Sequence, residues 1–255
     1  MEYTFNHRNN WKFKLLEPSL FQPTTDQLWL FYKTGKTVEK WAGHMLISYD
    51  CGESWSRPFT LPSDSLGSTR NPLLQLEDGW VLAPSSREIW IQRFPVFERF
   101  RYDDNEIQQI SLKSEDNLSK LLAIQPSLVQ RPDQSILVFC RTNLNFIYET
   151  QSFDGGLSWS PLKATDWYNP DSAITTLTMK NGFYLAANLS RTSRSRLQVV
   201  FVPWGNSDPQ KKVIEFFHKG KPIAYPSLIN LDDQELLIAY SISQKEICLR
   251  RISSQ

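Results

Sequence analysis

The sequence predicts an all-β protein built as a β-propeller of four-stranded blades. Short runs of apolar, β-branched and aromatic residues recur along the chain, such as LWLFYK, ILVFCR and ELLIAYS, and Asp, Asn, Gly or Pro residues separate them. Such runs are typical of strands joined by turns, and no stretch keeps a helical period of 3.6 residues over three turns. Similarity between segments of the chain, described next, indicates that the strands form repeated units.

One segment recurs with a nearly constant spacing. EPSLFQPTTDQLWLFYK begins at Glu17, NPLLQLEDGWVLAPSSR at Asn71 and QPSLVQRPDQSILVFCR at Gln125, so the first residues lie 54 positions apart twice. YPSLINLDDQELLIAYS begins at Tyr225, and SAITTLTMKNGFYLAAN, which begins at Ser172, fits as a degenerate copy. Each copy has the pattern of a β-hairpin, and a four-stranded unit of about 50 residues is typical of a propeller blade.

We therefore expect one domain over residues 1–255, with five blades that start near residues 17, 71, 125, 172 and 225. The last copy leaves room for about three strands, and the N-terminal segment YTFNHRNNWKFKL is expected to supply the fourth. Two alternatives remain open, an incomplete six-bladed propeller and a β-sandwich with short, evenly spaced strands.

Composition narrows the class of partner. Lys and Arg number 28 against 27 Asp and Glu, so no overall charge attracts nucleic acid or an anionic membrane. Cys51, Cys140 and Cys248 are too few and too scattered for a disulfide framework. No apolar segment has the length of a signal peptide core or a membrane span, so a cytoplasmic protein is expected, with secretion through a trimmed leader left open. The three histidines show no metal-ligand spacing, and no cofactor is expected.

Two octapeptides fit the pattern S-x-D-x-G-x-x-W. The pattern residues are Ser48, Asp50, Gly52 and Trp55 in the first copy, and Ser152, Asp154, Gly156 and Trp159 in the second. A weaker relative, WGNSDPQ, occupies residues 204–210. Together with QPSLVQRPDQSILVFCRTN and YPSLINLDDQELLIAYS, these motifs resemble the Asp-box (BNR) repeats of sialidase-like propellers, in particular the shorter bacterial and plant branch. The resemblance covers roughly residues 15–250. It implies that each box is a structural turn between the two outer strands of a blade, away from the substrate pocket.

Equivalent positions of the copies are expected to face a common centre. The opening residues Glu17, Asn71, Gln125, Ser172 and Tyr225 are all polar, although the strands that they begin are apolar. Sixteen positions later the copies carry Lys33, Arg87, Arg141, Asn188 and Ser241. Three cations at one repeat position indicate a convergent site for an anion, and arginine suits a planar carboxylate because its fork bonds both oxygens. The alternative is that these cations are solvated strand ends.

The resemblance to sialidases implies roles for single residues. Tyr225 matches the nucleophilic tyrosine, a recognised exception among glycosidases that use two carboxylates, and Arg141 matches an arginine of the carboxylate-binding triad. Gln125 stands where sialidases carry the glutamate that activates the tyrosine, so Glu17 or Glu88 must supply the base. Glu88 is the first choice for the acid/base, with Asp171 as another polar group at a blade entrance. The F/Y-R-I-P motif of the first triad arginine is absent, and Arg196 is one of three arginines that match the third triad position weakly.

Two functions follow from these assignments. The first is a sialidase-like exo-glycosidase that hydrolyses a terminal acidic or otherwise polar sugar. The second is a catalytically inactive propeller that binds a glycan or a protein partner through the same mouth. The fold by itself does not decide between them, and the oligomeric state stays open.

Overall fold

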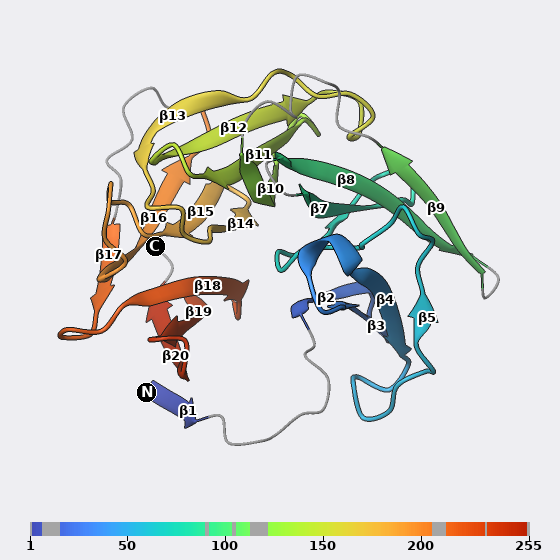
Figure 1. Cartoon of the computed structure of the whole chain (residues 1–255), viewed down its shortest axis with the longest axis horizontal. Helices are drawn as coiled ribbons and strands as arrows, with labels where there is room; N and C mark the ends of the chain where they lie inside the picture. The colour runs from blue at the N-terminus through green and yellow to red at the C-terminus, as the bar shows by residue number, and fades with distance from the viewer. Residues whose placement is uncertain are drawn as a thin grey trace.

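The structure is a computed structural model that describes residues 2–6, 16–89, 92–103, 106–112, 122–205, 213–232 and 234–253. Its described strands form five antiparallel sheets of four strands each. The sheets are arranged around a common centre, and strands β2, β10, β14 and β18 lie nearest to it (Figure 1). The prediction of an all-β propeller with five four-stranded blades is thus confirmed.

The chain builds the blades in order. Blade 1 contains β2 (Leu16–Thr24), β3 (Gln27–Thr34), β4 (Ala42–Ser48) and β5 (Phe59–Thr60), with the short 3-10 helix η1 (Val38–Lys40) between β3 and β4. Blade 2 contains β6 (Leu74–Gln75), β7 (Val81–Ile89), β8 (Gln92–Asp103) and β9 (Glu106–Leu112), and blade 3 contains β10 (Ala123–Gln130), β11 (Ile136–Thr142), β12 (Phe146–Ser152) and β13 (Lys163–Tyr168). Blade 4 contains β14 (Thr175–Met179), β15 (Gly182–Ala187), β16 (Arg196–Pro203) and β17 (Val213–Phe217). Blade 5 contains β18 (Ile223–Asn230), β19 (Glu235–Ile242), β20 (Glu246–Ser253) and β1 (Glu2–Asn6), which pairs antiparallel with β20.

Apolar clusters hold neighbouring blades together. Side chains alternate between the two faces of each sheet, so one strand contributes to two interfaces: in blade 3, Val138 packs toward blade 2 and Phe139 toward blade 4. Clusters of this kind join blades 1 and 2, 2 and 3, 3 and 4, and 4 and 5. In the part of the chain that the structure describes, no such cluster joins blade 5 to blade 1. There Leu20 and Ile229, which face this boundary, are 53% and 49% exposed.

Each blade begins at a residue with a left-handed backbone. The φ angles are 52° at Glu17, 67° at Arg70, 53° at Gln125, 51° at Asp171 and 57° at Tyr225. In blades 2 and 4 the equivalent residue is therefore Arg70 or Asp171, one position before the predicted Asn71 or Ser172. Aligning the copies on their proline gives the wrong register for blade 2. In blades 1, 3 and 5 the proline directly follows the left-handed residue, whereas in blade 2 Pro72 lies two residues after Arg70.

This shift matters because a one-residue change of register moves a side chain to the other face of its sheet. Leu82 packs toward blade 3, whereas Val81 and Ala83 pack toward blade 1. The position sixteen residues after Arg70 is Ser86, so Ser86, and not Arg87, is the equivalent of Lys33 and Arg141. Arg87 has the opposite orientation and donates a hydrogen bond to the carbonyl of Asp64, in the loop between blades 1 and 2.

The two octapeptides form nearly identical turns between the third and fourth strands of blades 1 and 3. In each turn the serine hydroxyl accepts a hydrogen bond from the glycine amide, at 2.8 Å for Ser48 and Gly52 and at 2.8 Å for Ser152 and Gly156. The aspartate accepts the amide of the residue four positions later, at 2.8 Å for Asp50 and 2.9 Å for Asp154. These are the structural turns that the resemblance implies. Of the weaker copy at 204–210, residues 206–210 lie outside the described part.

Candidate functional site

The residues that open the blades meet near the centre of the ring. Gln125 of blade 3 donates from Nε2 to both carboxylate oxygens of Glu17 in blade 1, at 3.1 and 3.2 Å. Arg141, on the second strand of blade 3, lies 3.3 Å from the carboxylate of Asp171 in blade 4. All five opening residues are non-glycine residues at positive φ. Such strained residues persist only where the surroundings hold them, and they gather at functional sites.

Arg70 is the central residue that the sequence did not single out. Its guanidinium donates to the carbonyl of Ile174 in blade 4, at 3.0 Å, and to the carbonyl of Pro226 in blade 5. It also lies 5.7 Å from the centre of the Tyr225 ring. Burial lowers the pKa of Arg70 to about 10, against the attraction of Glu17, so the side chain remains a cation at neutral pH. The sequence Arg70-Asn71-Pro72 contains this residue, but it aligns with the other opening residues only when the copies are aligned on the left-handed residue instead of on proline.

Two buried ionisable residues, Lys33 and Glu98, lie between blades 1 and 2 and interact electrostatically. Lys33 is fully buried and donates to the hydroxyl of Thr69. Burial lowers its pKa to about 8, although Glu17, Glu98 and Glu88 attract its charge. Glu98 is buried as well and accepts the backbone amides of Leu66 and Gly67, at 3.0 and 3.1 Å; burial raises its pKa against these bonds. Sequence reasoning missed Glu98, because an isolated glutamate in a strand gives no signal of its burial.

Glu88 is a second carboxyl group with a raised pKa, and it is less buried than Glu98. It is partly buried near the end of β7, and burial raises its pKa. Arg93, whose Nε lies 3.8 Å away, and then Arg141 oppose that rise, while the charge of Glu17 adds to it. The group therefore stays protonated to a higher pH than an exposed glutamate, which suits a general acid.

Several buried polar atoms near the centre have no hydrogen-bond partner among the described residues. They include Nη1 of Arg141 and Oε1 of Gln125. Buried polar atoms are paired in the large majority of cases, because leaving one unpaired costs about 1–3 kcal/mol. A polar ligand at the centre would remove that cost, since it could accept from the arginine and donate to the glutamine oxygen.

The remaining predicted residues have other contacts. Asn71 donates to the carbonyls of Gln125 and Pro126, at 3.2 and 2.9 Å, and Asn188 donates to that of Ile223, at 2.9 Å. Both amides thereby join neighbouring blades. Arg196 pairs with Glu215 on the exposed outer strands of blade 4, at 3.1 Å. The central group of predicted residues is therefore Glu17, Gln125, Arg141, Asp171 and Tyr225, with Lys33 and Glu88 within electrostatic reach.

The described residues contain no group of three or more His, Cys, Asp or Glu side chains arranged to hold a metal ion. Cys51 and Cys140 are free thiols, and burial raises the pKa of Cys140. Within the same residues no helix is long and apolar enough to cross a membrane.

Solved structures with the same fold include several sialidases. A protein of unknown function from Dyadobacter fermentans superposes with a TM-score of 0.69 at 13% identity, over 99% of this chain and 98% of that one. The sialidase of Trypanosoma rangeli, in complex with the inhibitor DANA, gives a TM-score of 0.70 at 14% identity, over 97% of this chain and 46% of that one. The NanB sialidase of Streptococcus pneumoniae gives 0.63 at 16% identity, over 82% of this chain and 35% of that one.

At these identities the superpositions show the fold alone, and this chain spans less than half the length of the two sialidases. No curated protein matches the sequence. The family of BNR repeat-like domains matches residues 6–238. The five blades, the two Asp-box turns and this match over most of the chain agree: the chain belongs to the BNR repeat-like domain family, and its propeller is sialidase-like.

Proposed function

We propose that this chain is a sialidase-like exo-glycosidase that hydrolyses a terminal acidic or polar sugar at the centre of the propeller. The observation that carries the proposal is the contact between Gln125 and Glu17. By the resemblance described above, Gln125 stands at the position of the glutamate that activates the tyrosine in sialidases. A glutamine side chain cannot act as a base. Its amide instead holds the carboxylate of Glu17 through both oxygens, so a base is fixed directly beside the substituted position.

The cations of the site suit an anionic substrate. Arg141 pairs with Asp171 through Nε, but its buried Nη1 has no hydrogen-bond partner among the described residues, so this nitrogen can donate to a carboxylate of the substrate. Arg70 is held by two backbone carbonyls and contributes a fixed positive charge next to Tyr225. We propose that Arg141 binds the substrate directly and that Arg70 contributes positive electrostatic potential around the bound substrate.

The roles form a double displacement. The oxygen of Tyr225 bonds to the anomeric carbon as the glycosidic C–O bond breaks, Glu17 accepts the phenolic proton, and Glu88 donates a proton to the leaving oxygen. Glu88, now a carboxylate, then takes a proton from a water molecule that attacks the anomeric carbon. The bond to the tyrosine breaks, and Glu17 returns the proton to the phenolate oxygen. A neutral phenol suits this role, because a carboxylate nucleophile would repel an anionic sugar.

Fluorogenic sialosides and uronosides test the proposal with four variants. Glu17→Gln, Tyr225→Phe and Glu88→Gln are each expected to lower kcat at least ~100-fold, the usual contribution of a general acid or base. Arg196→Gln is the matched control, because it removes an arginine of the same chain that pairs with Glu215 on the outer strands. The control is expected to leave kcat and KM unchanged.

The pH dependence of kcat/KM tests the role of Glu88 as the general acid. Because the pKa of Glu88 is raised, the alkaline fall of kcat/KM is expected above the range of an ordinary glutamate, and it should disappear in Glu88→Gln. Turnover in Tyr225→Phe equal to that of the wild type would remove the proposed mechanism. A protein that binds the sugars without hydrolysing any, and loses binding in Arg141→Ala, would be a propeller that only binds its ligand.

A further inference from the structure

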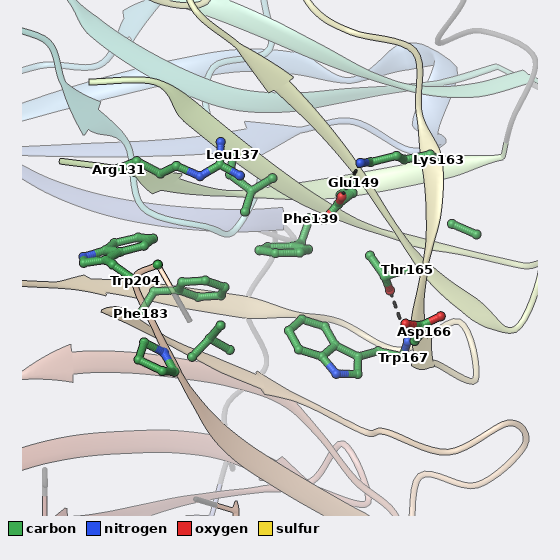
Figure 2. Close-up of a pocket in the computed structure, with 14 residues that line it drawn as sticks. Arg131, Leu137, Phe139, Glu149, Lys163, Thr165, Asp166, Trp167, Phe183 and Trp204 are labelled. Atoms are coloured by element: carbon green, nitrogen blue, oxygen red, sulfur yellow. Dashed lines mark hydrogen bonds and ion pairs between the residues drawn. The ribbon is translucent and has the colours of Figure 1, made fainter. Parts of the chain in front are cut away.

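A cavity with a volume of about 470 Å³ lies between blades 3 and 4, lined by none of the central residues Glu17, Gln125, Arg141, Asp171 and Tyr225. Strands β11 to β13 of blade 3 and β15 and β16 of blade 4 contribute its lining. Four aromatic rings form a continuous row along it, in the order Trp167, Phe139, Phe183 and Trp204, with neighbouring ring centres 5.6 to 5.7 Å apart (Figure 2). The two phenylalanines are buried and the two tryptophans are half-buried, so the indoles at the ends of the row are the accessible faces.

The position of this cavity has an equivalent one blade earlier, where a box tryptophan fills it. Trp159 of the second Asp box stacks on Phe97 of blade 2, with ring centres 3.8 Å apart, and Gly156 of the same box lies against Leu82. Counted from the opening residues Arg70 and Gln125, Leu82 of blade 2 corresponds to Leu137 of blade 3.

The same count places Glu149 at the position of Phe97. Pro84 corresponds to Phe139, and the partners of these two residues on the third strand are Phe97 and Glu149. Both Leu137 and Glu149 line the cavity. The cavity therefore occupies the position at which a box tryptophan of blade 4 would pack.

Blade 4 does not carry that tryptophan. Ser152 ends strand β12, and Pro203 ends the equivalent strand β16. Counted from there, the four box positions carry Pro203, Gly205, Ser207 and Gln210 in place of Ser, Asp, Gly and Trp. The sequence of blade 4 therefore has no tryptophan at the position of Trp159 in blade 3.

Loss of a box would leave an apolar hollow, but this cavity has a polar rim. Glu149 stands where blade 2 has Phe97, and its carboxylate pairs with the ammonium group of Lys163 at 3.1 Å. Asp166 adds an exposed carboxylate, and Arg131 is held by Gln151 at 3.2 Å. The rim therefore carries two cations and two anions, as Figure 2 shows beside the aromatic row. Balanced charges do not favour an ion, whereas apolar faces next to a few hydrogen-bonding groups fit a flat molecule rich in hydroxyls.

We propose that this cavity is a second carbohydrate site, which binds a neutral pyranose residue of a glycan. The apolar face of the ring stacks on Trp204 and Trp167, and its hydroxyls bond to the rim carboxylates and to Lys163. Trp204 is oriented for this role, because its Nε1 donates to the carbonyl of Met179 at 3.3 Å. The site is separate from the centre of the propeller, and it does not depend on the proposed hydrolysis.

The test measures binding of soluble neutral polysaccharides, one each of α-glucan, β-glucan, xylan, mannan and galactan, by affinity electrophoresis of the full chain. The affinity for at least one polysaccharide is expected to fall about two- to tenfold in Trp204→Ala, because one stacked aromatic contact contributes about 0.5–1.5 kcal/mol. Trp204→Phe is expected to retain most of it. Asp166→Ala removes an exposed rim group without touching the interior, so a loss of affinity there cannot be ascribed to misfolding.

Tyr225→Phe separates this site from the proposed function. That variant is expected to bind the neutral glycan as the wild type does, whatever its effect on hydrolysis. Two results would overturn the inference: no retardation by any of the five polysaccharides, or retardation that Trp204→Ala and Asp166→Ala both leave unchanged.

Discussion

The two Asp boxes have the same turn but very different surroundings. In blade 3, Trp159 is 7% exposed and stacks on Phe97 of the preceding blade. In blade 1, Trp55 occupies the same box position and is 36% exposed, with its Nε1 bonded to Gly52 of its own turn. A box tryptophan packs toward the preceding blade, which for blade 1 means across the boundary with blade 5. The motif therefore specifies the turn, and the neighbouring blade decides how much stability its tryptophan provides.

The largest difference is expected from truncation of the two tryptophans. Trp159→Ala should lower the free energy of unfolding by about 3–5 kcal/mol, the range for a large aromatic side chain removed from a core. Trp55→Ala should cost less, about 1–2 kcal/mol, because 36% of this residue is already exposed and the truncation therefore removes less buried area. Urea unfolding of both variants measures the difference. Equal losses would mean that blade 5 covers Trp55 in solution as fully as blade 2 covers Trp159.

The box glycines provide a second, smaller contrast. Both have positive φ, 92° at Gly52 and 85° at Gly156, so an alanine is strained at either position. A Cβ at Gly156 would also lie 3.0 Å from Leu82 of blade 2, whereas at Gly52 the nearest atom, in Leu28, lies at 3.6 Å. Gly156→Ala is therefore expected to cost about 1–3 kcal/mol more than Gly52→Ala, the usual penalty of overpacking. A larger loss for Gly52→Ala in the same urea titration would contradict the contrast.

The box aspartates are expected to give the smallest effect, and one that is alike in the two boxes. Hydrogen bonds from Ser54 chiefly lower the pKa of Asp50 to about 2, and at Asp154 the bonds from Ser158, Ser152 and Leu157 outweigh burial and lower the pKa as well. A carboxylate with a lowered pKa in the folded state stabilises it above the unfolded pKa, and the contribution is lost as the pH falls through the folded value.

Asp50→Asn and Asp154→Asn should therefore each lower Tm modestly at pH 6. The deficit should shrink between pH 4 and pH 2, where the wild-type carboxylates become protonated. Thermal unfolding over pH 2 to 6 measures it. A deficit that stays constant with pH would show that the charge of the carboxylate does not matter to the turn.

The repeat, the blade count and both turns could be predicted from the sequence, because each is a local pattern that recurs. The register of blade 2 could not, since its proline lies one position later relative to the left-handed residue, and this placed Asn71 and Arg87 where Arg70 and Ser86 lie. The Glu17–Gln125 contact was also beyond sequence reasoning. It joins residues 108 positions apart across the centre of the ring, and only the closed arrangement of the blades brings them together.

The missing cluster between blades 5 and 1 bears on how the protein unfolds. Among the described residues, four apolar interfaces join five blades, so blades 2, 3 and 4 each have two stabilising neighbours, and blades 1 and 5 have one. In repeat proteins, stability is close to a sum over the units and their nearest-neighbour interfaces. In its stability the propeller therefore resembles a linear array of five units, although its blades are arranged in a ring. Amide hydrogens are expected to exchange first in the two terminal blades and last in blade 3, and unfolding should proceed inward from both ends.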